Sequence, residues 1–296
     1  VLNLTDIILG NGIYVMSSTN TATPIFRSND GVVWTTNSTA LTIPAVQLNS
    51  VAYRNGYYVS VGNEIVQSDD SLTWLSRKTY NTVFDVSLNG VESIDTSNFG
   101  GFIAVGKGKK YDYSTGVTEL IDTNIIAYSY EASGEFWSDG PSLTPNGFNA
   151  VASNGTIAIA VGENNVVYQT TNGGSWTGIN EVDVVSINSA TDQLNVTNTA
   201  GFADADPIRV SNSFGGLTAG VTYYVDVITS TQVELFTDPA LTSQVSLLDA
   251  IIPLQCRMSL YDATAQTLND VAYVNNIWMT VGDSGRIQTS TDGLTW

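Results

Sequence analysis

The chain has 296 residues, of which 43% are hydrophobic and 13% are charged, and its formal net charge at pH 7 is −18 without a single histidine. So acidic a chain argues against nucleic acid and anionic membranes as partners, and the lack of histidine removes mechanisms that need a histidine base or ligand. The lack of a long apolar run argues against membrane insertion. One cysteine, Cys256, excludes an internal disulfide and a cysteine-rich zinc site. We see no signal peptide and no apolar run long enough to span a bilayer, and we expect no cofactor.

A unit of four short strands recurs along the chain. Its first strand contains an apolar residue followed directly by Asn. This strand recurs at residues 48–52, 88–91, 148–152 and 268–272, with a looser version at 4–8. A two-residue turn follows, as in Asn55-Gly56, and Asn-Gly between alternating apolar residues is a strong hairpin signal. The second strand ends in Val-Gly, and the third leads into a short turn that closes on tryptophan. The pattern therefore predicts an all-β chain of repeated four-stranded sheets.

The turn before each tryptophan has its own pattern. A Ser or Thr is followed two residues later by Asp or Asn, which caps backbone N–H groups, and usually by Gly, which takes a positive φ. A degenerate copy runs from residue 129 to residue 137. We expect the tryptophans at 34, 74, 137 and 176 to be buried within or between sheets. The structural residues of the turns are Ser28, Asp30 and Trp34; Ser68, Asp70 and Trp74; Trp137; Thr170, Asn172 and Trp176; and Ser290, Asp292 and Trp296.

These turns resemble the Asp-box (BNR-type) repeat of β-propellers such as sialidases, sortilin-like receptors and photosystem assembly factors. Most copies of that repeat carry one more residue between Asp and Trp, so the present turn is a shortened variant. The resemblance implies a β-propeller of at least five four-stranded blades. Residues 1–180 would hold blades one to four, and residues 265–296 would hold an incomplete fifth blade.

Two segments depart from the repeat. The interval from Trp34 to Trp74 is 40 residues, whereas that from Trp74 to Trp137 is 63, because residues 107–124 lengthen the connection between second and third strands. The 120 residues from Trp176 to Trp296 leave room for a small β domain inserted at residues 181–264. We expect its strands at residues 193–197, 207–210, 222–229 and 232–236. Its segment 216–225 resembles a small β module found in structural proteins of tailed phages.

Strand direction indicates where these two expansions lie. Strands alternate in direction within a blade, so residues 107–124 and 181–264 are expected on one face of the propeller, opposite the tryptophan turns. Elaborated loops on a rigid scaffold usually carry a binding surface. The candidate contact residues are Lys107, Lys109, Lys110, Tyr111 and Tyr113, which suit an acidic partner, a protein or a sugar. A solvated loop without a partner is the alternative.

A catalytic or calcium-binding role for the turn carboxylates Asp30, Asp70 and Asp292 is the weaker hypothesis, because each is placed to cap its own backbone. A sialidase-like site needs an arginine cluster and a Tyr–Glu pair, yet the six arginines stand at unlike positions of the repeat. No pair of acids stands out for glycoside hydrolysis, and Asp204 with Asp206 is too small a set for calcium.

The phage-like segment favours a non-enzymatic virion structural or host-attachment protein, associated with the tail or a fibre, with the propeller as a rigid binding scaffold. The expected partners are other virion proteins, or a receptor or glycan on the host surface, within a larger assembly. The alternative is an extracellular or cell-surface propeller that binds carbohydrate or hydrolyses glycosides. A photosystem-type assembly factor is disfavoured by the insertion, and the fold alone does not decide among these classes.

Overall fold

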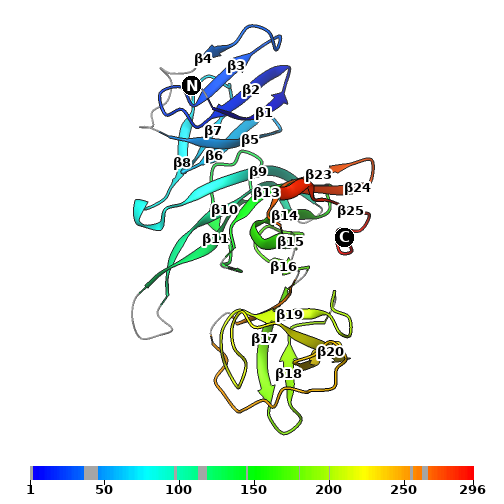
Figure 1. Ribbon diagram of the computed structural model, residues 1–296. Helices are drawn as coiled ribbons and strands as arrows, with labels where there is room; N and C mark the ends of the chain where they lie inside the picture. Colours follow the sequence, from blue (N-terminus) through cyan, green and yellow to red (C-terminus); the bar gives the residue numbers. More distant parts are fainter. Residues whose placement is uncertain are drawn as a thin grey trace.

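The structure is a computed structural model that describes residues 3–36, 46–96, 99–112, 119–144, 146–179, 181–199, 201–253, 256–261 and 266–296 (Figure 1). In these ranges it contains five antiparallel sheets and one closed barrel, and its only helices are three single 3-10 turns. None of these described helices is long and apolar enough to cross a membrane. The chain is therefore all-β, as the sequence predicted.

The five sheets are the blades of a propeller, and in each the strands lie side by side in chain order. Blade one is β1 (Leu4–Gly10), β2 (Ile13–Ser18), β3 (Ile25–Ser28) and β4 (Thr35–Thr36); blade two is β5 (Leu48–Arg54), β6 (Tyr57–Gly62), β7 (Glu64–Ser68) and β8 (Leu75–Thr79); blade three is β9 (Ser87–Thr96), β10 (Phe99–Asp112), β11 (Glu119–Ser129) and β12 (Ser138–Asp139); blade four is β13 (Phe148–Ser153), β14 (Ala158–Gly162), β15 (Val167–Thr170) and β16 (Thr177–Gly178); blade five is β23 (Leu268–Val274), β24 (Ile277–Gly282) and β25 (Ile287–Ser290). The 3-10 turns are η1 (Thr82–Phe84), η2 (Glu163–Asn165) and η3 (Asp283–Gly285).

Apolar side chains hold consecutive blades together. Between blades two and three, for example, Val59, Val61 and Ile65 pack against Leu88 and Phe102, and all five are fully buried. Burying one such side chain stabilises a fold by roughly 1.5–3 kcal/mol. Comparable clusters join blades one and two, three and four, and four and five.

The first strand of every blade carries a β-bulge at the same point. Its pairing with the second strand skips one residue, which is Thr5, Asn49, Asn89, Asn149 or Asn269. A bulge bends the strand and redirects a side chain. At four of the five positions this side chain reaches the next blade and donates to a backbone carbonyl: Thr5 to Leu48 O (2.9 Å), Asn49 to Leu88 O (2.8 Å), Asn89 to Phe148 O (2.8 Å) and Asn149 to Leu268 O (2.9 Å).

The blades form an open arc. The inner strands succeed one another as β1, β5, β9, β13 and β23, each packed against the next, and no comparable packing joins β23 to β1 in the described part of the chain. Figure 1 shows blade one (blue) and blade five (red) apart from each other. Among the described residues, one face of each end blade is therefore without a neighbouring blade.

The insertion after β16 folds as a closed six-stranded barrel with its own core (Figure 1, lower part). Its strands are β17 (Glu181–Asn188), β18 (Gln193–Val196), β19 (Pro207–Val210), β20 (Tyr223–Thr229), β21 (Gln232–Phe236) and β22 (Arg257–Leu260). Four of them lie where the sequence predicted strands, whereas β17 and β22 were not predicted. Strand β22 has four residues and pairs with both β17 and β19, so barrel closure rather than a local pattern defines it.

The segment 107–124 is not the loop that the sequence suggested. Strands β10 and β11 continue through it as one long hairpin, with Lys107 opposite Asn124 and Asp112 opposite Glu119. The pair of Lys109 and Asp122 places opposite charges across the hairpin, which favours continued pairing. Tyr113 lies outside the described residues.

The prediction that the turn tryptophans are buried holds only for Trp74. Trp34, Trp137 and Trp176 are half-buried. Their indole N–H groups donate to the glycine carbonyl of their own turn, at 3.2 Å for Gly31 and 2.8 Å for the other two, and this bond keeps each ring against its turn. The large tryptophan buried between blades four and five is instead Trp278, in β24.

Candidate functional site

The tryptophan turns lie on separate blades and are bonded internally. Asp30, Asp70 and Asp292 each accept the backbone N–H groups two and three residues further on, at 2.6–2.9 Å. Asn172 makes the same pair of bonds at 3.1 and 2.8 Å, so the turn does not require a carboxylate. The N–H groups of Thr295 and Leu294 lower the pKa of Asp292 to about 2, because they stabilise its charged form.

The hydroxyl groups of the turns complete this pattern. Ser28, Thr170 and Ser290 accept the N–H of the glycine three residues on, at 2.8–2.9 Å. That glycine has a positive φ in each case, and in blade two Ser71 takes the same conformation with a φ of 61°. Ser68 donates to Asp70 at 3.0 Å. The structure does not bring the turn residues of different blades into one site.

The base of the β10–β11 hairpin borders a cavity of about 550 Å³ between blades three and four. Lys107 forms an ion pair of 3.0 Å with Glu163, in the connection between β14 and β15. Glu163 also accepts the N–H of Gly147 at 3.0 Å. Partial burial opposes the ionisation of Glu163, but these two contacts hold its pKa below the usual value. Asp85, Lys109 and Asp122 line the same cavity.

The remaining candidate contact residues lie further out on this hairpin. Tyr111 is exposed and meets the ring of Phe84 edge to face, with 5.6 Å between the ring centroids. Lys110 is half-buried and stands opposite Ile121. The structure thus gathers Lys107, Lys109, Lys110 and Tyr111 on one hairpin, with Lys107 engaged by the neighbouring blade.

A second cavity, of about 610 Å³, lies among the inner strands of all five blades. Its carboxylates are Asp6, Glu92 and Asp270, and none of the described residues that line it is Lys, Arg or His. Asp6 accepts the hydroxyl of Ser50 at 2.7 Å and the N–H of Val51 at 2.9 Å. Burial raises the pKa of Glu92 to about 7, although the Ser93 N–H opposes this shift.

These three acids are not among the site residues that the sequence predicted. The sequence did contain a signal for them, because each lies close to the apolar–Asn pattern that marks an inner strand. Inner strands surround the axis of a propeller, so this position predicts that the three acids lie near the axis. None of the six arginines lines this cavity. Five of them have unrelated partners: Arg27 with Ser71, Arg54 with Asp95, Arg77 with Glu135, Arg209 with the ring of Tyr261, and Arg257 with Glu181. In the described ranges, no group of three or more His, Cys, Asp and Glu side chains is placed to hold a metal ion.

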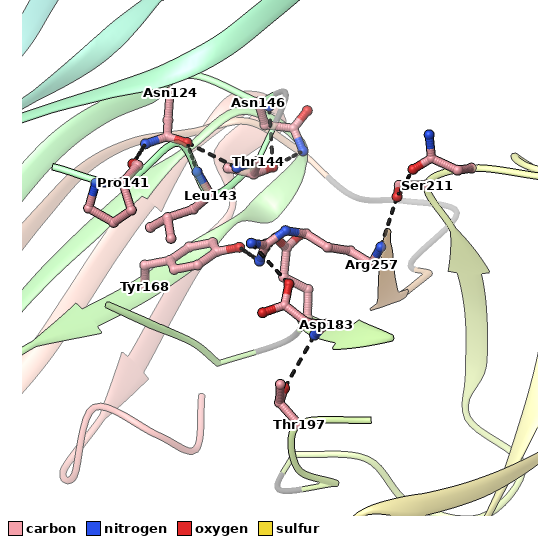
Figure 2. A network of polar contacts seen from close by, with 12 residues as sticks. Asn124, Pro141, Leu143, Thr144, Asn146, Tyr168, Asp183, Thr197, Ser211 and Arg257 are labelled. Carbon is pink, nitrogen blue, oxygen red and sulfur yellow. Dashed lines mark hydrogen bonds and ion pairs between the residues drawn. The ribbon is translucent and has the colours of Figure 1, made fainter. Parts of the chain in front are cut away.

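A polar cluster, buried except for the half-exposed Asp183, joins the barrel to blade four. Arg257, in β22, pairs with Glu181 and Asp183 of β17 at 3.1 Å each, and donates to the hydroxyl of Tyr168 in β15 at 2.8 Å. Figure 2 shows Arg257 reaching toward the Tyr168 hydroxyl, with Asp183 beside it. Tyr168 also donates to Glu181. Burial raises the pKa of Glu181 to about 7, and Arg257 opposes that shift. This cluster fixes the orientation of the barrel on the propeller.

No model of a known protein family matches the chain, and no curated protein matches it. Among solved structures, the chain is similar to YCF48 bound to a D1 peptide, at 15% identity over 100% of this chain and 81% of that one, with a TM-score of 0.41. It is also similar to a catalytically inactive virginiamycin B lyase from Staphylococcus aureus with quinupristin, at 10% identity over 97% and 94% of the two chains, with a TM-score of 0.44. A computationally designed protein, Ika8, is 9% identical over 97% and 70% of the chains, with a TM-score of 0.42. At these identities and TM-scores the likeness does not extend to the side chains of a site.

Proposed function

We propose that this chain is a non-enzymatic binding and assembly protein, a tail- or fibre-associated component of a tailed-phage virion, whose propeller is a rigid scaffold for the β10–β11 hairpin and the barrel. The bonds within the tryptophan turns support assigning the repeat to the Asp-box type. The phage setting rests on the resemblance of segment 216–225 to phage modules.

The observation that carries the proposal is the hairpin. Its base packs against Glu163, which lies in a connection between second and third strands, and against Gly147, which lies in a blade-to-blade connection. The barrel is inserted into another blade-to-blade connection, between β16 and β23. Both additions therefore belong to one face of the propeller, and rigid scaffolds present binding surfaces in this way.

The chemistry of the hairpin indicates the kind of partner. In a chain of net charge −18, Lys110 and Tyr111 place a cationic side chain and an exposed aromatic ring on the part of the hairpin that lies beyond the cavity. Such a surface suits a virion protein or a host receptor that presents carboxylates, because opposite charges steer association.

The test uses a variant in which residues 109–122 are replaced by Asn-Gly. Gly108 and Thr123 stand directly opposite each other, so a two-residue turn can close the shortened hairpin. We expect the blades to keep their melting temperature and the phage to lose attachment rate or particle assembly. The matched control is Val32→Glu, a charge added to an exposed turn on the other face.

Immunogold labelling of purified phage particles with antibodies to the chain tests the location. Gold at the tail or fibres supports the proposal. Unlabelled particles contradict it, as does normal attachment by the shortened hairpin together with loss of attachment in Val32→Glu.

The acidic central cavity favours one alternative, a carbohydrate-binding or glycoside-hydrolase propeller. Its volume suits a small sugar, and Glu92, with a pKa raised to about 7, is placed to exchange hydrogen bonds or a proton. A glycan array distinguishes the two functions. Glycan binding that Glu92→Gln abolishes and the shortened hairpin retains would support this alternative.

A further inference from the structure

The third strand of blade three has a longer outer edge than the third strands of the other blades. Those strands have four or five residues, whereas β11 has 11. The fourth strand, β12, pairs with β11 only at Ala127 and Tyr128. Figure 1 shows the outer half of the β10–β11 hairpin projecting from the blades. Most of the edge of β11 is therefore not covered by the fourth strand.

The segment that follows β12 covers this edge as far as Asn124. The N–H of Asn124 points away from β10 and donates to Thr144 O at 3.0 Å. The Asn124 side chain holds the segment in place, because it donates to Pro141 O and accepts the N–H groups of Leu143 and Thr144 (Figure 2). Among the described residues, no backbone hydrogen bond on this edge extends the cover beyond Asn124 toward the tip of the hairpin.

Two residues nearer the tip present unpaired backbone groups. In an antiparallel ladder, the N–H and C=O groups of successive residues point alternately to one side of the strand and to the other. Because the N–H of Asn124 points outward, the N–H and C=O groups of Asp122 and Leu120 point outward as well. No bond from the described part of the chain reaches these outward groups. An exposed edge of this kind is a template for a further strand.

The side chains beside this edge border a notch above blade four. Lys109 and Tyr111 stand opposite Asp122 and Leu120 and share their face of the hairpin. Nearer the blades the same face packs against blade four. Further out, the cavity of about 550 Å³ separates it from Glu163. Tyr111 and Leu120 are each 42% exposed at the rim, so the side chains of an added strand would enter a partly enclosed space.

The charges around the notch favour a cationic side chain. Its carboxylates are Asp85, Asp122 and Glu163, and its ammonium groups are Lys107 and Lys109. Lys107 is paired with Glu163, so two carboxylates remain for one ammonium group. A basic residue opposite Asp122 would form a favourable cross-strand pair. The net charge of −18 attracts a basic segment from a distance as well.

We propose that the outer edge of β11 binds an extended peptide segment of a partner protein, which adds as an antiparallel strand. The segment exchanges hydrogen bonds with the backbones of Asp122 and Leu120. It carries a basic residue opposite Asp122, an apolar residue opposite Leu120, and between them a β-branched residue opposite the half-buried Ile121. In such strand addition the backbone bonds give affinity and the alternate side chains give specificity. The binding mode depends neither on a phage setting nor on Lys110, which lies on the opposite face of the hairpin.

The test measures binding of a fluorescein-labelled peptide, acetyl-TKVLTST, to the chain of residues 1–296 by fluorescence anisotropy. Its lysine, valine and leucine would lie opposite Asp122, Ile121 and Leu120. The N–H groups of the lysine and leucine then point at β11, and that of the valine points away. Methylation of the lysine and leucine nitrogens should weaken binding about 4- to 100-fold, the effect of two hydrogen bonds. Methylation of the valine nitrogen is the matched control and should leave the affinity unchanged.

Variants of the protein locate the site. Asp122→Pro removes the outward N–H and spares the ladder bonds to β10, and proline is tolerated at edge positions of this kind. Asp122→Asn keeps the N–H and should weaken binding about 2- to 5-fold through the lost charge pair. Asp122→Pro should weaken it about 2- to 10-fold more. Lys110→Ala should bind the peptide like the unmodified chain, so failure of this site and failure of the attachment role are distinguishable.

Circular dichroism verifies that each variant is folded, and the methylated peptides keep the test decisive because they leave the protein unchanged. The proposal is overturned if the peptide shows no saturable binding, or if both methylated peptides bind with the same affinity. Equal binding by Asp122→Asn and a folded Asp122→Pro would overturn it too. Analytical ultracentrifugation tests the other occupant of the edge. A dimer of the unmodified chain that Asp122→Pro disperses would assign the edge to a second copy and contradict the proposal.

Discussion

At the scale of single residues, side chains that bond their own backbone recur in this protein. The carboxylate of Asp70 accepts two backbone N–H groups of its turn and the hydroxyl of Ser68. Asn172 occupies the same place in blade four with the same geometry. The contacts of this residue depend on an oxygen acceptor rather than on charge.

We therefore expect Asp70→Ala to destabilise the chain by about 1 kcal/mol, the usual cost of losing a side-chain cap. Asp70→Asn is the matched control and should keep most of the stability, because the amide oxygen replaces the acceptor. Urea denaturation followed by tryptophan fluorescence measures both. Equal losses in the two variants would mean that the charge, and not the turn geometry, matters.

Glu92 is a residue whose environment opposes its ordinary charge. Burial raises its pKa to about 7 from the ordinary value of 4.5 that it has in the unfolded chain. The folded state therefore holds a proton that the unfolded state releases. The stability due to this proton is fully present below pH 4.5 and is lost as the pH rises through 7.

The variant Glu92→Gln should match the original chain in stability at pH 4 and exceed it at pH 8 by up to roughly 3 kcal/mol. The measurement is the difference in the free energy of unfolding between the two chains, taken across this pH range. Parallel curves for the two chains would show that Glu92 titrates normally.

At the scale of elements, the bulged inner strand is the device that joins one blade to the next. The bulge at Asn149 directs its amide to the carbonyl of Leu268, on the other side of the 119-residue interval that contains the barrel. Two elements far apart in the chain are thereby held at the distance of adjacent blades.

We expect Asn149→Ala to cost about 1–3 kcal/mol, because the buried carbonyl of Leu268 loses its side-chain donor. Asn269→Ala is the control within the same chain, since Asn269 has the same bulge but donates to exposed Asp283 of its own blade. This control should be nearly neutral, because water can replace the bond to an exposed carboxylate. Thermal unfolding of both variants checks the difference, and similar losses would contradict the role assigned to the junction bond.

At the scale of the whole molecule, the barrel and the propeller meet through the cluster of Arg257, Glu181, Asp183 and Tyr168. Removing one member of a buried ion pair leaves the other charge without compensation, and such changes cost about 3–5 kcal/mol. We expect Arg257→Met to have an effect of this size near pH 8 and a smaller one at pH 5, where Glu181 binds a proton.

Limited proteolysis between the barrel and blade four measures this prediction, together with urea denaturation at both pH values. Adding Glu181→Gln to Arg257→Met should recover part of the stability, because the uncompensated charge is then absent. No recovery in the double variant would show that packing of the Arg257 stem, rather than charge, holds the junction.

The sequence by itself determined the repeat, the strands of the blades, the hairpin turns and the place of the insertion. These features depend on local signals, namely Asn-Gly turns, alternating apolar residues and the tryptophan turns, which act over a few residues. The prediction of four strands per blade was confirmed for blades one to four, and in blade five the structure describes three.

Only the tertiary structure decided how these elements meet. Closure of the barrel through β22, the continued pairing of β10 with β11 and the half-burial of the turn tryptophans all depend on neighbours that no local pattern names. The same holds for the ion pair of Glu181 and Arg257, 76 residues apart, and for the cavity that collects Asp6, Glu92 and Asp270. Burial and charge contacts arise between residues that folding brings together. A local sequence pattern identifies one residue of such a contact but not its distant partner.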